Sequence, residues 1–72
     1  MNKLVLYNDD VNSFDGVILS LMEVLKHNVY QAEQCAVIVH KVGKCDIKVG
    51  NIKELEKYKK ELKDRGLKIK IE

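Results

Sequence analysis

The fold is decided by the stretch YNDDVNSFD, Tyr7–Asp15, where an apolar run ends and a helical pattern begins. Residues 3–7, just before and into this stretch, are rich in Leu, Val and Tyr, which predicts a strand that is buried on at least one face. The polar residues Asn8–Ser13 then predict a turn, because their side-chain oxygens can accept hydrogen bonds from nearby backbone N–H groups. Working outward from this turn gives the order of the remaining elements.

A first helix is predicted directly after the turn. Two residues compete for its N-cap: Asn12, with Asp15 three positions on where a capping box has its acidic residue, and Ser13. Gly16 in the first turn costs roughly 1 kcal/mol relative to Ala; a close backbone neighbour or a nearby ligand would explain it, and drift would explain it equally well. Apolar residues at helical spacing continue the pattern to about Lys26, namely Phe14, Val17, Ile18, Leu21 and Leu25.

A second helix and a second strand follow. Asn28 is the predicted N-cap of this helix, and Gly43 is well placed as the left-handed residue that ends it. Val37 and Ile38 make the helix apolar on several sides, so we expect it to be the most buried element. Residues 45–49 alternate between apolar and polar side chains, which predicts a half-buried strand with Cys45, Ile47 and Val49 inward.

Asn51 is the clearest N-cap in the chain and begins a third helix, which Gly66 ends. Its expected buried residues are Ile52, Leu55, Tyr58 and Leu62. Residues 67–71 alternate as a final strand. The order strand, helix, helix, strand, helix, strand predicts one domain over residues 1–72, an α+β two-layer sandwich with a three-stranded antiparallel sheet packed against three helices.

Composition argues against a nucleic-acid-binding protein and against a membrane protein. The chain has 72 residues and a net charge of +2 from 13 basic and 11 acidic residues, which gives no general electrostatic reason to bind nucleic acid. It has no recognisable signal peptide and no apolar run near the roughly 18 residues of a membrane span. We therefore expect a soluble, cytoplasmic monomer that does not associate with a membrane and keeps its cysteines reduced.

His40 is the first candidate for a functional side chain. It follows Val39 near the end of the apolar second helix, so we expect it at the boundary of the core. One interpretation is a structural histidine bonded to a carbonyl group or to water. The other needs Asn8 and Asp9 as partners, because an amide oxygen, a carboxylate and a neutral imidazole together offer three acceptors to an ammonium group.

Metal binding and catalysis are disfavoured by the sequence. The acidic cluster of Asp9, Asp10 and Asp15 lacks the spacing of a calcium loop, and a polar turn with a helix cap explains it better. A zinc site of Cys35, His40 and Cys45 would lack a fourth ligand and a C-x-x-C element, and both cysteines are better explained as core residues. No nucleophile has a base and an orienting group beside it. We expect no cofactor and no enzymatic activity.

Taken together, these motifs resemble the ClpS family of protease adaptors. The resemblance runs from Leu4 to Ile71 and is carried by NDD at residues 8–10 and by VHxxG at residues 39–43, with Phe14, Val17–Ile18 and Gly66–Leu67 in the same order. It implies a protein that is not an enzyme. ClpS proteins bind the N-terminal residue of a substrate, the N-degron, and deliver the substrate to the ClpA or ClpC unfoldase of the Clp protease.

The resemblance also implies residue roles. Asn8, Asp9 and His40 would hold the free α-amino group of the substrate, a known mode of peptide recognition. In the family the pocket for the first side chain selects Leu, Phe, Tyr or Trp. Several relatives carry methionine at the positions of Phe14 and Ala36, and Lys53 and Tyr58 replace residues that some relatives use to dock the unfoldase. The implied pocket residues are Asp10, Asn12, Phe14, Val17, Ala36, Val39 and Leu67.

Two other functions remain open. The C-terminal domain of the bacterial ribosomal stalk protein has a similar fold and binds translation factors through a lysine-bearing helix, and the lysine-rich segment 53–70 is compatible with that role. That domain does not need the NDD and VH motifs. A small RNA-binding domain ranks last, because the chain lacks interleaved aromatic residues on a strand for stacking bases.

Overall fold

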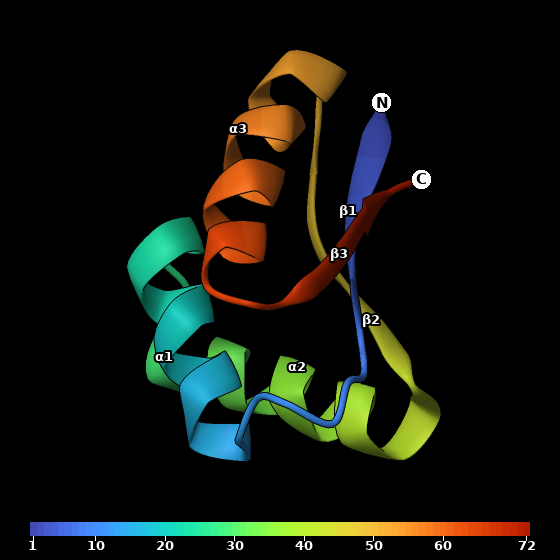
Figure 1. Ribbon diagram of the computed structural model, residues 1–72. Coiled ribbons are helices and arrows are strands. Elements are labelled where there is room, and N and C mark those ends of the chain that lie inside the picture. Colours follow the sequence, from blue (N-terminus) through green and yellow to red (C-terminus); the bar gives the residue numbers. More distant parts are fainter.

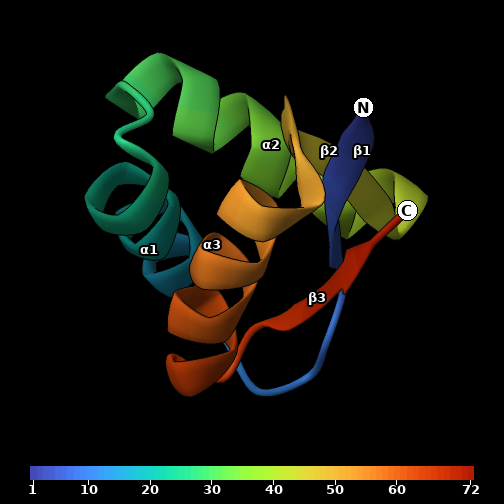
Figure 2. The same ribbon diagram turned by 90° about the horizontal axis from the view of Figure 1, so that it is seen from above.

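The computed structural model describes residues 1–72 and contains the six elements in the predicted order. They are β1 (Asn2–Tyr7), α1 (Phe14–Leu25), α2 (Val29–Val42), β2 (Lys44–Gly50), α3 (Ile52–Asp64) and β3 (Lys68–Ile71). The strands form one antiparallel sheet in the order β2-β1-β3. All three helices lie to one side of the sheet (Figures 1 and 2), which confirms the α+β two-layer prediction. None of the helices is both long and apolar enough to cross a bilayer.

The core lies between the helices and the inner face of the sheet. Its largest fully buried side chains are Leu4, Leu6, Leu21, Leu55 and Leu62, each 0 or 1% exposed. The middle strand β1 is therefore the most buried element. The expectation that the second helix is the most buried was wrong, because α2 packs against α1 and β2 and leaves its other sides in solvent. Ile38 on α2 is 41% exposed.

Local capping signals begin and end the helices. Ser13, and not Asn12, caps α1, accepting a hydrogen bond from the Gly16 N–H at 3.0 Å. A Cβ on Gly16 would lie 3.0 Å from the same Ser13 hydroxyl, so a larger residue there would have to displace the capping side chain slightly. Asn28 and Asn51 cap α2 and α3 as predicted, accepting from the N–H groups three residues on, each at 2.8 Å.

A β-bulge in β2 changes the alternation that the sequence predicted. Leu4 on β1 lies opposite Lys48 and Val5 lies opposite Asp46, so Ile47 between them has no partner. The extra residue turns Lys48 toward the helices, where its ammonium lies 5.4 Å from the centre of the Tyr58 ring. Val49 then points to the outer face and is 54% exposed, so its predicted burial was wrong.

Ile52 also differs from its prediction. It is 53% exposed, whereas Leu55 and Leu62 on the same helix are fully buried and Tyr58 is half-buried. Leu55 and Leu62 are seven residues apart and face the sheet together, while Ile52 lies about 60° around the helix from Leu55. In the first turn of α3 that direction faces solvent.

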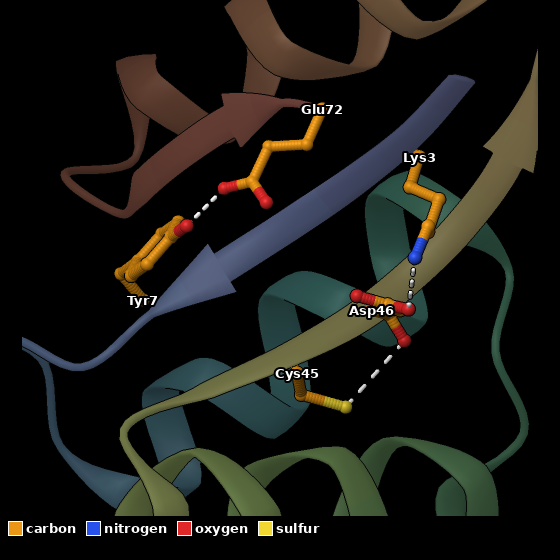
Figure 3. A network of polar contacts seen from close by, with 5 residues as sticks. All are labelled: Lys3, Tyr7, Cys45, Asp46 and Glu72. Carbon is orange, nitrogen blue, oxygen red and sulfur yellow. Dashed lines mark hydrogen bonds and ion pairs between the residues drawn. The ribbon is translucent and has the colours of Figure 1, made fainter.

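The outer face of the sheet carries a polar network instead of a helix (Figure 3). The Lys3 ammonium lies 3.5 Å from the Asp46 carboxylate, joining β1 to β2, and the Tyr7 hydroxyl donates to the Glu72 carboxylate just after β3. The hydrogen bond to Glu72 raises the pKa of Tyr7. These exposed polar groups suit a sheet face that is in contact with water.

Candidate functional site

The candidate site forms where the end of β1 meets the end of α2. The backbone N–H of Asn8 donates to the carbonyl of Gly43 at 2.9 Å, and the Gly43 N–H donates to Val39 at 2.9 Å. Gly43 has a φ of 102°, a left-handed conformation that suits glycine and lets the chain leave α2 and enter β2. These two bonds bring the NDD and VHxxG motifs together, although they are about thirty residues apart in the chain.

A cavity of about 420 Å³ lies at this junction. It is lined from three directions, by the turn after β1, by the start of α1 and by the C-terminal half of α2. The lining residues are Asn8, Asp9, Asp10, Asn12, Phe14, Val17, Ala36, Val39 and His40. Asn8, Asp10 and His40 are exposed, whereas Ala36 and Val39 are only 3% and 5% exposed. The cavity therefore has a polar outer part and an apolar inner part.

The polar part is organised by Asp9. One oxygen of its carboxylate, Oδ1, accepts from the backbone N–H groups of Val11 and Asn12, both at 2.8 Å. Partial burial opposes ionisation of Asp9, but these backbone donors, the Asn12 amide and the charge of Lys68 outweigh it and lower the pKa. Asp9 is therefore a carboxylate at neutral pH and places a negative charge beside the cavity.

The apolar part is continuous with the core. Val39 belongs to the main buried cluster, and Val17 packs against that cluster. Phe14 is 44% exposed and sits at the rim. Because Ala36 has only a methyl group, it leaves open the space that a larger residue at this helix position would occupy. The cavity can thus take an apolar group that enters past polar side chains.

Comparison with known proteins identifies the family. The family model described as the ATP-dependent Clp protease adaptor protein ClpS matches residues 1–70. The chain belongs to the ClpS family. Among solved structures, that of Agrobacterium tumefaciens ClpS2 bound to L-phenylalaninamide is similar, with a TM-score of 0.94 and 23% identity over 99% of this chain and 93% of that one. At this identity the likeness shows a shared fold. No curated protein matched the chain.

The ClpS fold brings together all but one of the residues that the sequence singled out for the site. Leu67 is the exception: it is 3% exposed, lies in the core cluster and does not line the cavity. His40 lines the cavity next to buried Val39 and is itself exposed, so it lies on the solvent side of the core boundary. Its side chain makes no hydrogen bond within the protein, so the structural interpretation of His40 has no carbonyl partner.

Sequence reasoning missed one contributor, the carbonyl of Gly66. It accepts from Asn12 Nδ2 at 2.7 Å and so connects the turn after β1 to the turn between α3 and β3. The two residues are 54 positions apart, and nothing in the local pattern of either one signals the contact.

Neither of the two cysteines lines the cavity. No three His, Cys, Asp or Glu side chains are grouped so that they could hold a metal ion. Cys35 is buried in the core and Cys45 packs against it. Burial and the neighbouring Cys35 thiol raise the pKa of Cys45 to about 12, so this thiol stays protonated and is a poor nucleophile and metal ligand.

Proposed function

We propose that this ClpS-family protein binds the N-terminal residue of substrate proteins and presents them for degradation by a Clp protease. The observation that carries the proposal is the cavity itself, in which hydrogen-bond acceptors surround an apolar interior. An N-terminal residue with a large apolar side chain has the complementary arrangement, because its charged amine and that side chain are attached to the same carbon atom.

The α-amino group would bind Asn8, Asp9 and His40. An ammonium has three N–H donors, and the Asn8 amide oxygen, the Asp9 carboxylate and a neutral His40 nitrogen can each accept one. The negative charge of Asp9 favours the charged amine. Acetylation removes the charge and two donors and leaves acceptors unpaired, which typically costs about 1–3 kcal/mol for each group.

The first side chain would enter the apolar interior beside Val17, Ala36 and Val39, with Phe14 at the rim and Asp10 and Asn12 nearby. Leu, Phe, Tyr and Trp fit this description, and the small Ala36 leaves space for an aromatic ring. The ligand of Agrobacterium ClpS2, L-phenylalaninamide, combines a free amine with a phenyl side chain, which supports the same type of ligand here.

Delivery is the second half of the proposal and rests on family membership. The expected partner is the ClpA or ClpC unfoldase in the cytoplasm, with the adaptor acting as a monomer that has no catalytic group of its own. The alternative role, binding of translation factors through the lysines of α3, makes no use of the cavity.

Peptide binding measured by fluorescence anisotropy tests recognition. The peptides differ only at residue one, with Leu, Phe, Trp, Met or Ala, and an N-acetyl-Leu peptide is included. We expect micromolar or tighter binding for Leu and the aromatic residues, lost on acetylation and strongly weakened in His40→Ala. His27→Gln is the matched control, because His27 is the only other histidine and does not line the cavity.

Absence of binding to any free N-terminus would refute recognition and direct attention to the lysines of α3. Delivery needs a separate assay, in which a reporter protein that begins with Leu is degraded by ClpAP or ClpCP with and without this adaptor. Binding without accelerated degradation would keep the recognition half and refute the delivery half.

A further inference from the structure

Asn12 joins three parts of the site through one amide group. Its Nδ2 atom lies 2.7 Å from the Gly66 carbonyl oxygen and 3.2 and 3.4 Å from the two oxygens of the Asp9 carboxylate. An amide nitrogen has two hydrogens. One is directed at Gly66 and the other is shared between the Asp9 oxygens, so both are used.

Chemistry fixes the orientation of this amide. If the nitrogen and oxygen exchanged places, the Asn12 oxygen would face the Gly66 carbonyl and the Asp9 carboxylate, which are all acceptors. In that arrangement the Asn12 oxygen would be repelled by the Asp9 carboxylate and by the Gly66 carbonyl oxygen, and no hydrogen bond would form between these groups. Asn12 therefore acts as a donor to Asp9.

The two oxygens of Asp9 have different surroundings. Oδ1 accepts from two backbone N–H groups at 2.8 Å and from the Asn12 amide, so its lone pairs are fully used within the turn. Oδ2 receives only the Asn12 amide at 3.2 Å. A carboxylate oxygen can accept two hydrogen bonds, so Oδ2 retains capacity for one more donor.

We propose that Asn12 is a positioning residue for amine capture: by tying Asp9 to the Gly66 carbonyl, it holds the carboxylate so that Oδ2 faces the ligand ammonium. This inference rests on the proposed function. Asn12 does not need to touch the ammonium itself; it acts through Asp9.

Backbone hydrogen bonds hold the Gly66 carbonyl, the other partner of Asn12, in place. Gly66 adopts a φ of 87°, and its N–H donates to the Lys63 carbonyl at 2.9 Å where α3 ends. The next residue, Leu67, donates to Leu62 at 3.1 Å and is buried in the core. The Asn12 side chain thus connects Asp9 to the packed end of α3. The Gly66–Leu67 segment contributes to the site through the backbone carbonyl of Gly66.

The test compares Asn12→Ala and Asn12→Leu with wild type. Leu keeps the approximate size of Asn but has no donor. Asn51→Ala is the matched control, because it also removes one side-chain hydrogen bond of an Asn, at 2.8 Å to the Glu54 N–H, but far from the cavity. Two readouts are needed: anisotropy with Leu and N-acetyl-Leu peptides, and an NMR titration of the Asp9 carboxyl carbon without ligand.

Both Asn12 variants should weaken binding of the free Leu peptide by roughly fivefold to tenfold, the net value of one positioned hydrogen bond. Their discrimination against the acetylated peptide should fall by the same factor, and the pKa of Asp9 should rise toward its ordinary value. Asn51→Ala should change the melting temperature only. If the role of Asn12 were purely structural, its substitution would lower the melting temperature without changing the discrimination between free and acetylated peptides or the titration of Asp9.

Two results would overturn the proposal. One is a discrimination ratio in the Asn12 variants within twofold of wild type, and the other is an Asp9 titration that does not move. If wild type itself binds no free N-terminus, the proposed function fails and the ligand part of this inference fails with it. The ligand-free titration still reports whether Asn12 holds Asp9, so the two failures are distinguishable.

Discussion

Acidification is expected to destabilise this fold through His27. This residue lies between α1 and α2, directly after Lys26, which has a φ of 60°. Its Nε2 lies 3.0 Å from the carbonyl oxygen of Ile47, the bulge residue of β2, and its Nδ1 is closed off from solvent without a partner. The neutral ring therefore donates from Nε2 and fastens the interhelical turn to the bulge.

Protonation would place a second N–H on Nδ1, where no acceptor exists. Burial, with a smaller effect from Lys48, lowers the pKa of His27 below its ordinary value of 6.5, although the hydrogen bond to Ile47 opposes this. The unfolded chain therefore takes up the proton first as the pH falls. The stability due to neutral His27 is complete above pH 6.5 and is lost as the pH falls from 6.5 through the lower pKa of the folded state.

The loss of folding free energy on protonation comes from one unsatisfied N–H donor, which costs about 1–3 kcal/mol if it is fully buried. Since the ring as a whole is partly exposed, we expect the low end, about 1 kcal/mol. That is a substantial share of the roughly 4–11 kcal/mol expected for 72 residues. In a domain of this size, 1 kcal/mol corresponds to a shift in melting temperature of about 4–8 °C.

The assay is thermal unfolding followed by circular dichroism between pH 5 and pH 8. His27→Gln keeps an amide donor for the Ile47 carbonyl but does not titrate, and His40→Gln is the control with the other histidine changed. The wild-type and His40→Gln melting temperatures should fall below pH 6.5 relative to His27→Gln. Parallel curves for all three proteins, or a pH dependence that disappears with His40, would refute the reasoning.

Three further predictions concern the site and its surroundings. Leu67→Ala should lower the free energy of unfolding, measured in urea, by about 2–5 kcal/mol, because Leu67 is a core residue. The peptide affinity of the folded protein should stay within twofold of wild type, and a selective loss of affinity would show that Leu67 does line the pocket. Ala36→Met should weaken binding of Trp and Phe peptides more than Leu peptides, because it fills the apolar interior; equal losses would argue against side-chain entry there. Arg65→Ala should lower stability by less than about 1 kcal/mol, since the Arg65–Glu23 pair is exposed, and a larger loss in thermal unfolding would contradict this.

The order of elements was predictable because its signals are local. Asn28 and Asn51 each cap a helix by bonding an N–H three residues on, and Gly43 and Gly66 adopt left-handed φ angles where helices end. Each interaction involves residues close together in the chain, so the amino-acid pattern contains both partners. The identities of the cavity residues came from the family resemblance, which the match of the ClpS family model to residues 1–70 supports.

Two of the errors, at Val49 and Leu67, arose where a distant element decides the outcome. The bulge at Ile47 is a feature of the pairing with β1, and His27 contacts it from the turn between α1 and α2; an alternating sequence gives no sign of either. Val49 was therefore placed on the wrong face of the sheet. Leu67 was placed in the pocket by analogy, whereas packing of the end of α3 directs it into the core.

The structural contacts of each acceptor decide which substitutions report on amine capture alone. The sequence presents Asn8, Asp9 and His40 as equivalent acceptors, but Asp9 also closes the turn through the N–H groups of Val11 and Asn12. Asp9→Ala would remove both functions, so a loss of binding would not identify the ammonium contact.

His40 and Asn8 are cleaner probes. The His40 side chain is exposed and makes no hydrogen bond, and Asn8 is bound to Gly43 through its backbone N–H, which a side-chain substitution preserves. If the ammonium is held by three acceptors, His40→Ala and Asn8→Ala should each weaken binding of free N-termini without changing the melting temperature by more than a few degrees. A large loss of stability in either variant would show that the substituted side chain supports the fold, and a loss of binding in that variant would then not identify an ammonium contact.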